Sequence, residues 1–322
     1  MWTKPWKMGE GFLIATGLII TGLLLQLSIG PVDWDLFAWP VNGVVLACLL
    51  VTILMMHLLR KRVTAFGFMG TYAAAIPALA FASVLTVVMG LTHQQKGGAW
   101  LSDMLTFWPF VLIYTYIALI LGLVILRQII TTVFSHHPSP ITQHPSPITQ
   151  HPSLLLHLGL FLALTTATLG NADIRRVAMW VTNNPAMANE LAGAEVFHQY
   201  ETFALDETTD QKVELPLAIE LKKFIKEEYE DGSPRRYASQ VVIYSKASLQ
   251  SYAATIDVNH PAKVDGWKIY QNSYEETPLG EACQVSILEL IRDPWLPAVY
   301  VGIYMMIAGA VCMLFVGGKR KR

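Results

Sequence analysis

Charged residues and cysteines are both scarce in this sequence, and each shortage narrows the class of protein. Only 15% of the 322 residues are charged, while 53% are hydrophobic; a soluble domain carries roughly 25% charged residues. The shortage of charge predicts that lipid, not water, covers much of the surface. The formal net charge of -1 offers no excess of positive charge to attract a nucleic acid, so we expect none as a partner.

The three cysteines are placed where they support neither redox nor metal chemistry. Cys48 and Cys312 lie within apolar runs, Cys283 stands alone in a polar region, and no Cys-x-x-Cys pair occurs. This placement counts against a thiol–disulfide oxidoreductase and against a cysteine-ligated zinc or iron–sulfur site. No glycine-rich phosphate loop, Ser-His-Asp triad or pair of catalytic carboxylates stands out either, so we predict no catalytic residue.

Six apolar segments are about as long as a membrane span, which takes about 20 residues to cross roughly 30 Å of hydrocarbon. They cover residues 11–30, 40–59, 72–91, 104–126, 153–169 and 296–317. The first lacks a small-residue cleavage site, so we expect an anchor rather than a signal peptide. The fifth is short, which favours a helix packed inside a bundle over one exposed to lipid.

Basic residues predict the orientation of these spans. They cluster before the first span, after the second and the fourth, and at the end of the chain: Lys4, Lys7, Arg60–Arg62, Arg127 and Lys319–Arg322. Six spans with both termini in the cytoplasm put every cluster on the cytoplasmic side, as the positive-inside rule requires. Arg175 and Arg176, just beyond the fifth span, are the exception. We therefore expect a multi-pass protein of the bacterial inner membrane, in contact with lipid, with residues 171–294 in the periplasm.

The periplasmic stretch reads as β structure. Four segments are rich in strand formers or alternate apolar and polar residues: Val241–Tyr244, Tyr252–Ile256, Trp267–Tyr270 and Val285–Leu288. Turn residues separate them at Asn259–Pro261 and Asp265–Gly266, and a helix is expected over Ala186–Tyr200. The predicted fold is a membrane α-helical bundle of six transmembrane helices with one mostly antiparallel β domain inserted before the last helix. The expected divisions are spans one to four in 1–134, a cytoplasmic linker in 135–152, span five in 153–170, the β domain in 171–294, and span six with its basic tail in 295–322.

The predicted linker repeats a histidine- and proline-rich heptad. HPSPITQ begins at His137, recurs at His144 and starts a third time at His151. So much proline predicts an extended, polyproline-like segment. Histidines seven residues apart offer a way to capture metal or heme, but a flexible chain holds ligands at a high entropic cost. A duplicated linker is therefore the favoured interpretation.

Two histidines lie inside apolar runs, where ionisable groups are costly and often functional. His57 precedes Arg60 by three residues, and His157 follows Ser153, a candidate helix N-cap, by four. At 1.5 Å per residue, each lies about 4–6 Å from the cytoplasmic end of its span. Imidazole is a common axial ligand of heme iron. Two imidazoles at matching depth are therefore candidates to bind one porphyrin between them. Alternatively, each bonds to a neighbouring helix or reaches toward the headgroups.

Four stretches together resemble the ResB-like family of cytochrome c biogenesis proteins, known as system II. They are Leu154–Phe161 with its histidine, Leu215–Phe224, the stretch Val258–Pro261 continued by Asp265–Tyr274, and Arg292–Trp295 followed by Tyr300–Gly302. The last two are the most specific. Trp39–Asn42 fits the shorter, Bacteroidetes-type members.

The resemblance implies a function and a site. Members of this family move heme b from the cytoplasm to the outer face, where it is joined to the Cys-x-x-Cys-His motif of apocytochrome c. A membrane histidine of the ResB-like half is thought to ligate the heme iron, and the matching residue here is His157. His57 has no clear counterpart in the family and stays a candidate ligand from its position alone.

The resemblance also implies a partner. The family's CcsA half supplies a tryptophan-rich WGxxWxWD motif, which this sequence lacks, so the chain would be a non-catalytic or co-catalytic subunit that needs a CcsA-type membrane protein. Small residues such as Ala298 and Gly302 in the last span are expected to pack against that partner. The alternative is a membrane receptor or scaffold that docks a protein and binds no heme. His198 and His260 are expected to be surface and turn residues, and Trp267, Tyr270 and Tyr274 to pack the domain core.

Overall fold

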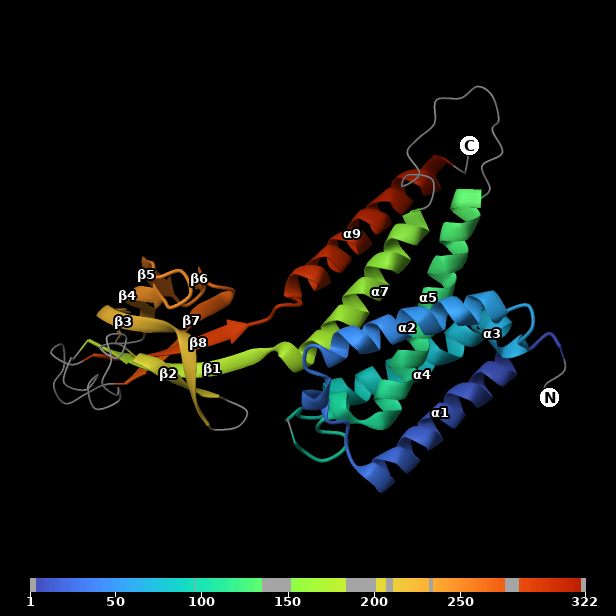
Figure 1. The fold of residues 1–322 in the computed structure, drawn as a ribbon, viewed down its shortest axis with the longest axis horizontal. Helices are drawn as coiled ribbons and strands as arrows, with labels where there is room; N and C mark the ends of the chain where they lie inside the picture. The colour runs from blue at the N-terminus through green and yellow to red at the C-terminus, as the bar shows by residue number, and fades with distance from the viewer. Residues whose placement is uncertain are drawn as a thin grey trace. The chain divides into compact units, whose positions relative to one another are not determined.

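A computed structural model describes residues 4–95, 97–134, 152–183, 201–206, 211–231, 234–275 and 284–319. The chain divides into two compact units, Met1–Ala172 with Trp295–Arg322, and Asp173–Pro294. The first unit contains the long helices and the second contains the strands (Figure 1). The heptad repeat and the helix expected over Ala186–Tyr200 lie outside the described residues.

Within the described part of the chain, six helices are long and apolar enough to cross a membrane. They are α1 (Met8–Ile29), α2 (Val41–Leu59), α4 (Tyr72–Leu91), α5 (Trp108–Phe134), α7 (Pro152–Gly170) and α9 (Leu296–Lys319). All six predicted apolar helices are therefore present. A short helix α3 (Thr64–Met69) between α2 and α4 was not predicted, nor were the 3₁₀ turns η1 (Trp34–Phe37), η2 (Met104–Thr106) and η3 (Asn171–Asp173).

Helix α5 forms the centre of the helical unit. It packs against α1, α2, α4 and α7, and 56% of its most apolar stretch is buried, against 33% for α7. The short fifth span is thus not the most enclosed helix. Helix α7 instead packs mainly against one neighbour.

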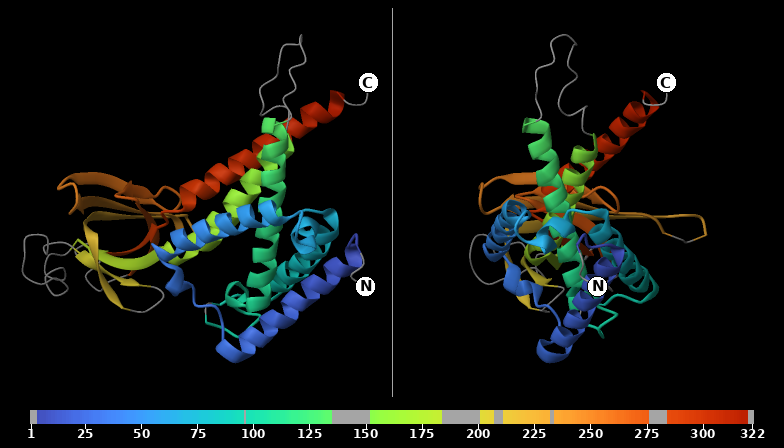
Figure 2. Two further views of the ribbon diagram at one scale, coloured as in Figure 1. Left: turned by 45° about the vertical axis from the view of Figure 1, so that its right-hand side comes forward. Right: turned by 90° about the vertical axis from the view of Figure 1, so that its right-hand side faces the viewer.

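That neighbour is α9, which runs antiparallel along α7 (Figures 1 and 2). A Cβ atom built on Gly159 would lie 2.6 Å from the carbonyl oxygen of Gly302, and one built on Gly302 would lie 2.7 Å from that of Gly159. Only glycine permits such an approach of two backbones, as in small-residue contacts between membrane helices. The prediction that Gly302 serves a partner protein is therefore wrong, because α7 of the same chain occupies that face.

The second unit is one eight-stranded sheet. Its strands are β1 (Arg175–Thr182), β2 (Glu201–Asp206), β3 (Lys212–Glu228), β4 (Pro234–Ser245), β5 (Ser251–Asp257), β6 (Ala262–Val264), β7 (Trp267–Glu275) and β8 (Val285–Arg292). The order across the sheet is β5-β4-β3-β2-β1-β8-β7-β6, and every neighbouring pair is antiparallel. This confirms the antiparallel β domain, and the four predicted strand segments lie in β4, β5, β7 and β8.

The first and last strands of the domain are neighbours. β1 pairs with β8 along its whole length, from Arg175 opposite Arg292 to Thr182 opposite Val285. The chain therefore enters and leaves the sheet at adjacent points.

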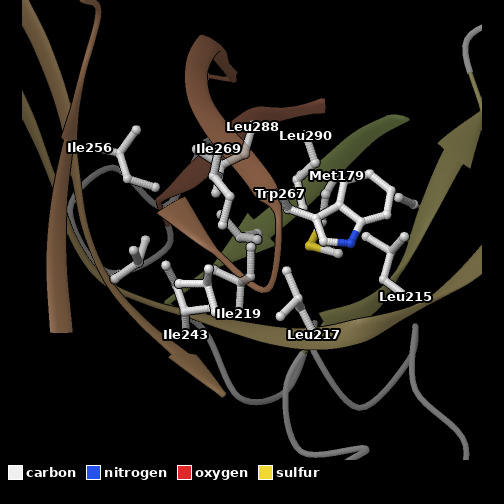
Figure 3. Packing of buried hydrophobic residues seen from close by; sticks show 14 of the residues in the cluster. Met179, Leu215, Leu217, Ile219, Ile243, Ile256, Trp267, Ile269, Leu288 and Leu290 are labelled. Atoms are coloured by element: carbon white, nitrogen blue, oxygen red, sulfur yellow. The ribbon is translucent and has the colours of Figure 1, made fainter. Parts of the chain in front are cut away.

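One face of the curled sheet encloses a hydrophobic core (Figure 3). Trp267 and Ile269 of β7 point into it, 3% and 0% exposed, because alternate residues of a strand share a face. Tyr274 packs against the same cluster, its ring 5.0 Å from that of Phe224. The prediction that Trp267 and Tyr274 pack the core is confirmed. Tyr270 is only half-buried and lies outside that cluster, since it alternates with Trp267 and Ile269.

Gln271, within the Tyr270–Tyr274 stretch, belongs to a small buried polar cluster. The Ser239 hydroxyl of β4 donates to Gln271 Oε1 at 2.6 Å, and Gln271 Nε2 donates to Ser286 Oγ at 3.0 Å. All three side chains are almost fully buried. Since a buried polar group is costly unless it is bonded, Gln271 links β4, β7 and β8 rather than serving a ligand.

Turns and one ion pair close the β5–β7 end of the sheet. Asp265 and Gly266, with φ of 49° and 80°, make the predicted turn between β6 and β7. His260 is an exposed turn residue, as predicted. Burial opposes ionisation of Asp257, yet hydrogen bonds from Arg236 and the Val258 amide, with the charges of Arg236 and His260, hold the pKa of Asp257 below its usual value.

Candidate functional site

The strongest site candidate is the imidazole of His157, in the second turn of α7. The helix begins at Pro152, a residue suited to a first turn because its missing N–H is not needed there. The sequence predicted Ser153 as the N-cap of this helix. In the structure Ser153 lies inside the helix, so that prediction is wrong. The His157 side chain is half-buried and turns toward α5.

A hydrogen bond to a side chain of α5 orients this imidazole. His157 Nδ1 lies 3.2 Å from Oε1 of Gln128. An amide oxygen only accepts, so the bond places the proton on Nδ1 and leaves the lone pair on Nε2. The amide nitrogen of Gln128 in turn donates to the Ser153 hydroxyl at 3.5 Å.

This arrangement is the one that a metal-binding histidine usually has. The second ring nitrogen of such a histidine donates to a carboxylate, carbonyl or water, which fixes the tautomer and the ring orientation. Gln128 provides that acceptor for His157. Gln128 was not predicted as a site residue. The available signal was a polar amide near the end of an apolar helix, directly after Arg127.

His57 has different surroundings. It is 6% exposed, and Nη1 of Arg60 lies 3.0 Å from its Nδ1 and 2.9 Å from its Nε2. Whichever nitrogen carries the lone pair, a guanidinium donor is within bonding distance of it. Ligation of iron by His57 stays a prediction, and it would require Arg60 to move aside.

The two histidines are not brought together. Helices α2 and α7 meet at one end, where the Asn42 side chain donates to the Leu169 carbonyl at 3.2 Å. They separate toward the opposite ends, which carry His57 and His157 (Figures 1 and 2). The cavity beside His57 is lined by α2, by α5 and by α3 with the glycine that follows it, and includes no residue of α7. The geometry thus gives no support to a sandwich of one porphyrin between these two side chains.

The donor set fits heme better than a bare metal ion. Among the described residues, no three His, Cys, Asp or Glu side chains gather into a metal-binding group. Heme iron needs only axial ligands from the protein, since the porphyrin occupies its equatorial positions. A single oriented imidazole is therefore sufficient for one axial bond. Cys283 and His198 lie outside the described residues.

These features are those of a multi-span membrane protein that carries one antiparallel β domain. Residues 149–286 match the ResB-like family, so the chain contains a ResB-like region. The resemblance inferred from the motifs is confirmed over this range, which includes His157 and the Asp265–Tyr274 stretch. The Arg292–Trp295 motif and α9 lie beyond the matched residues.

Two further similarities were found. Protein NrfI of Wolinella succinogenes is 29% identical over an alignment of 118 residues that covers 34% of this chain and 12% of NrfI. The chain thus matches only a small part of that relative's length. A solved structure, Cytochrome c Heme Lyase CcmF, aligns with 72% of this chain and 34% of its own, at 12% identity and a TM-score of 0.35. That score is too low to carry an argument. The family match and NrfI support a role in cytochrome c biogenesis.

Proposed function

We propose that this chain is the ResB-like subunit of a system II cytochrome c synthetase. It binds heme b in the membrane through Nε2 of His157. Together with a CcsA-type membrane protein, it presents the heme for covalent attachment to apocytochrome c. The observation that carries the proposal is the hydrogen bond by which His157, inside the region that matches the ResB-like family, donates through Nδ1 to Gln128 of α5, which lies outside that region.

The local environment suits the capture of heme as cargo. The imidazole is fixed before heme arrives, so little side-chain freedom is lost on binding. The apolar helices around it exclude water that would compete for the iron. Among the described residues, no second oriented imidazole lies beside His157. We propose that the partner supplies the other axial ligand.

The visible spectrum of the purified chain tests this function. The full chain, expressed with and without a CcsA-type protein, is purified in mild detergent and its absorbance is recorded. A Soret band that accompanies the complex supports heme handling. A chain that purifies intact with its partner and never carries heme fits the receptor or scaffold function instead and refutes the proposal.

Gln128 provides a finer test of the imidazole's orientation. Loss of the partner of a metal-binding histidine typically lowers metal affinity by roughly 10- to 100-fold, and we expect Gln128→Leu to weaken hemin binding to that extent. Gln128→Glu retains an acceptor for Nδ1 and should bind nearly as wild type. Titration of the purified chain with hemin, followed at the Soret band, measures both.

A hydroxyl three residues after Gln128 in α5 supplies the matched control. Thr131 is exposed, and its hydroxyl bonds only to carbonyls of its own helix among the described residues. Thr131→Val should therefore leave hemin affinity unchanged. If Gln128→Leu binds hemin as tightly as Thr131→Val, the hydrogen bond to His157 has no part in binding.

The proposed location is the bacterial inner membrane, with both termini in the cytoplasm and the β domain in the periplasm. A reporter that is active only outside the cytoplasm should be active when inserted after Asp231, an exposed turn residue. The same reporter should be inactive when fused after Arg322. This result follows from the basic clusters, which resist transfer across the membrane. The opposite pattern would reverse the orientation of every span.

A further inference from the structure

A second polar site lies at the end of the helical unit that carries the basic residues. A cavity of about 210 Å³ is bounded by Arg60 at the end of α2, Arg127 near the end of α5, and His57. Phe66, Leu123 and two glycines, Gly67 in α3 and Gly70 just after it, complete the lining. The glycines add no side chains, and a Cβ on Gly67 would lie 3.0 Å from the Arg60 carbonyl oxygen. The chain therefore keeps an open space whose lining includes two arginine residues.

The charges around this cavity are not balanced. Neither Arg60 nor Arg127 forms an ion pair with an acidic side chain in the described part of the chain. Arg60 is instead oriented by the imidazole of His57, at 2.9 and 3.0 Å. Two like charges that share a cavity at a membrane boundary repel each other, and an anion between them would remove that repulsion. His57 thereby has a role as an orienting acceptor, which needs no iron.

The size and the chemistry of the cavity restrict the ligand. Guanidinium groups favour carboxylate and phosphate, which they bind through paired N–H donors. The volume is below the roughly 300–1,000 Å³ of pockets that enclose a whole drug-sized ligand. Only the acidic group of a larger molecule would enter, and the rest would lie among the apolar helices.

We propose that Arg60 and Arg127 form a binding site for the carboxylate or phosphate group of a membrane-borne amphiphile. Two sources share this chemistry: the propionate groups of a porphyrin and the headgroup of an anionic phospholipid. The porphyrin source rests on the proposed function, whereas the phospholipid source does not.

The test uses the full chain in detergent and two pairs of probes that differ only in acidity. Iron-free protoporphyrin IX is compared with its dimethyl ester, and phosphatidylglycerol with phosphatidylcholine. Since protoporphyrin IX has no iron, its binding does not depend on ligation by His157. Failure of this site and failure of the His157 assignment are thereby distinguished.

The variant Arg60→Gln/Arg127→Gln removes both charges, and Arg60→Lys/Arg127→Lys retains them. The loss of charged hydrogen bonds should weaken binding of the acidic member of at least one probe pair about tenfold or more, down to the level of its uncharged counterpart. The lysine variant should recover part of this loss. Lys61→Gln/Arg62→Gln is the matched control, because both residues are exposed, adjacent and outside the cavity lining.

Each result has a definite meaning. A loss confined to protoporphyrin identifies a propionate site, a loss confined to phosphatidylglycerol identifies a phospholipid site, and a loss of both identifies a site open to either anion. If the Lys61→Gln/Arg62→Gln control loses binding equally, the effect arises from surface charge alone and the proposal is overturned. The proposal is also overturned if the glutamine variant still prefers the acidic member of both probe pairs as strongly as the wild type does.

Discussion

Replacing His157 with glycine should remove or reshape the Soret band of heme that co-purifies with the chain and its CcsA-type partner. An imidazole with a second nitrogen ligand gives low-spin heme, and the loss of one axial ligand changes that spectrum. Added imidazole fits the space left by the deleted side chain and should restore part of the band. Absorbance spectra of the purified complex, with and without imidazole, measure the effect.

The control for this variant is His260→Gly. His260 is an exposed turn residue of the β domain, so the change should cost domain stability at most and leave the heme signal of the surviving protein intact. A His157→Gly protein that keeps a wild-type heme spectrum and still supports cytochrome c assembly would show that the iron is held elsewhere.

The variant Gly159→Leu should disrupt the pairing of α7 with α9. Even the first atom of the new side chain would lie 2.6 Å from the Gly302 carbonyl oxygen and 2.7 Å from the Met306 amide nitrogen. Overpacking of a tight interface costs about 1–3 kcal/mol and sometimes more, and here backbone atoms of α9 block the space. We expect a marked fall in the midpoint of thermal unfolding in detergent.

Gly17→Leu in α1 is the matched control, because a Cβ at Gly17 meets nothing within 4 Å. The same substitution there should leave the unfolding midpoint within a degree or two of wild type, as is usual for open positions. If the Gly159 and Gly17 variants unfold at the same temperature, α7 and α9 do not meet as closely as the structure shows. Gly159 lies two residues after His157 in α7. A variant in which α7 and α9 pack less closely should therefore also bind hemin more weakly.

The long helices and four of the eight strands, β4, β5, β7 and β8, were predictable because each has a local sequence pattern. An apolar run of about 20 residues has few alternatives to a helix in lipid, and alternation as in Trp267–Tyr270 has few alternatives to a half-buried strand. Helix α3 was missed because its six residues carry no period of their own. Strand β3 was missed because Pro216 and the pair Lys222–Lys223 interrupt its apolar pattern.

The candidate site was predictable only in part. His157 was identifiable because an imidazole inside an apolar run is costly. Gln128 was not, because its role depends on a contact between residues 29 positions apart. Gly302 shows the same limit: a small residue signals that a helix approaches closely, but it does not say which one.

The side-by-side ends of the β domain make it a module of the chain. Because Arg175 lies opposite Arg292, the 173–294 segment can be exchanged or reshaped without changing the path of the helices, as is common where the two ends of a domain are close. Helices α7 and α9 would remain a hairpin held by their own glycine contacts. Selection could therefore alter what the sheet recognises while His157, Gln128 and the two arginines stay as they are.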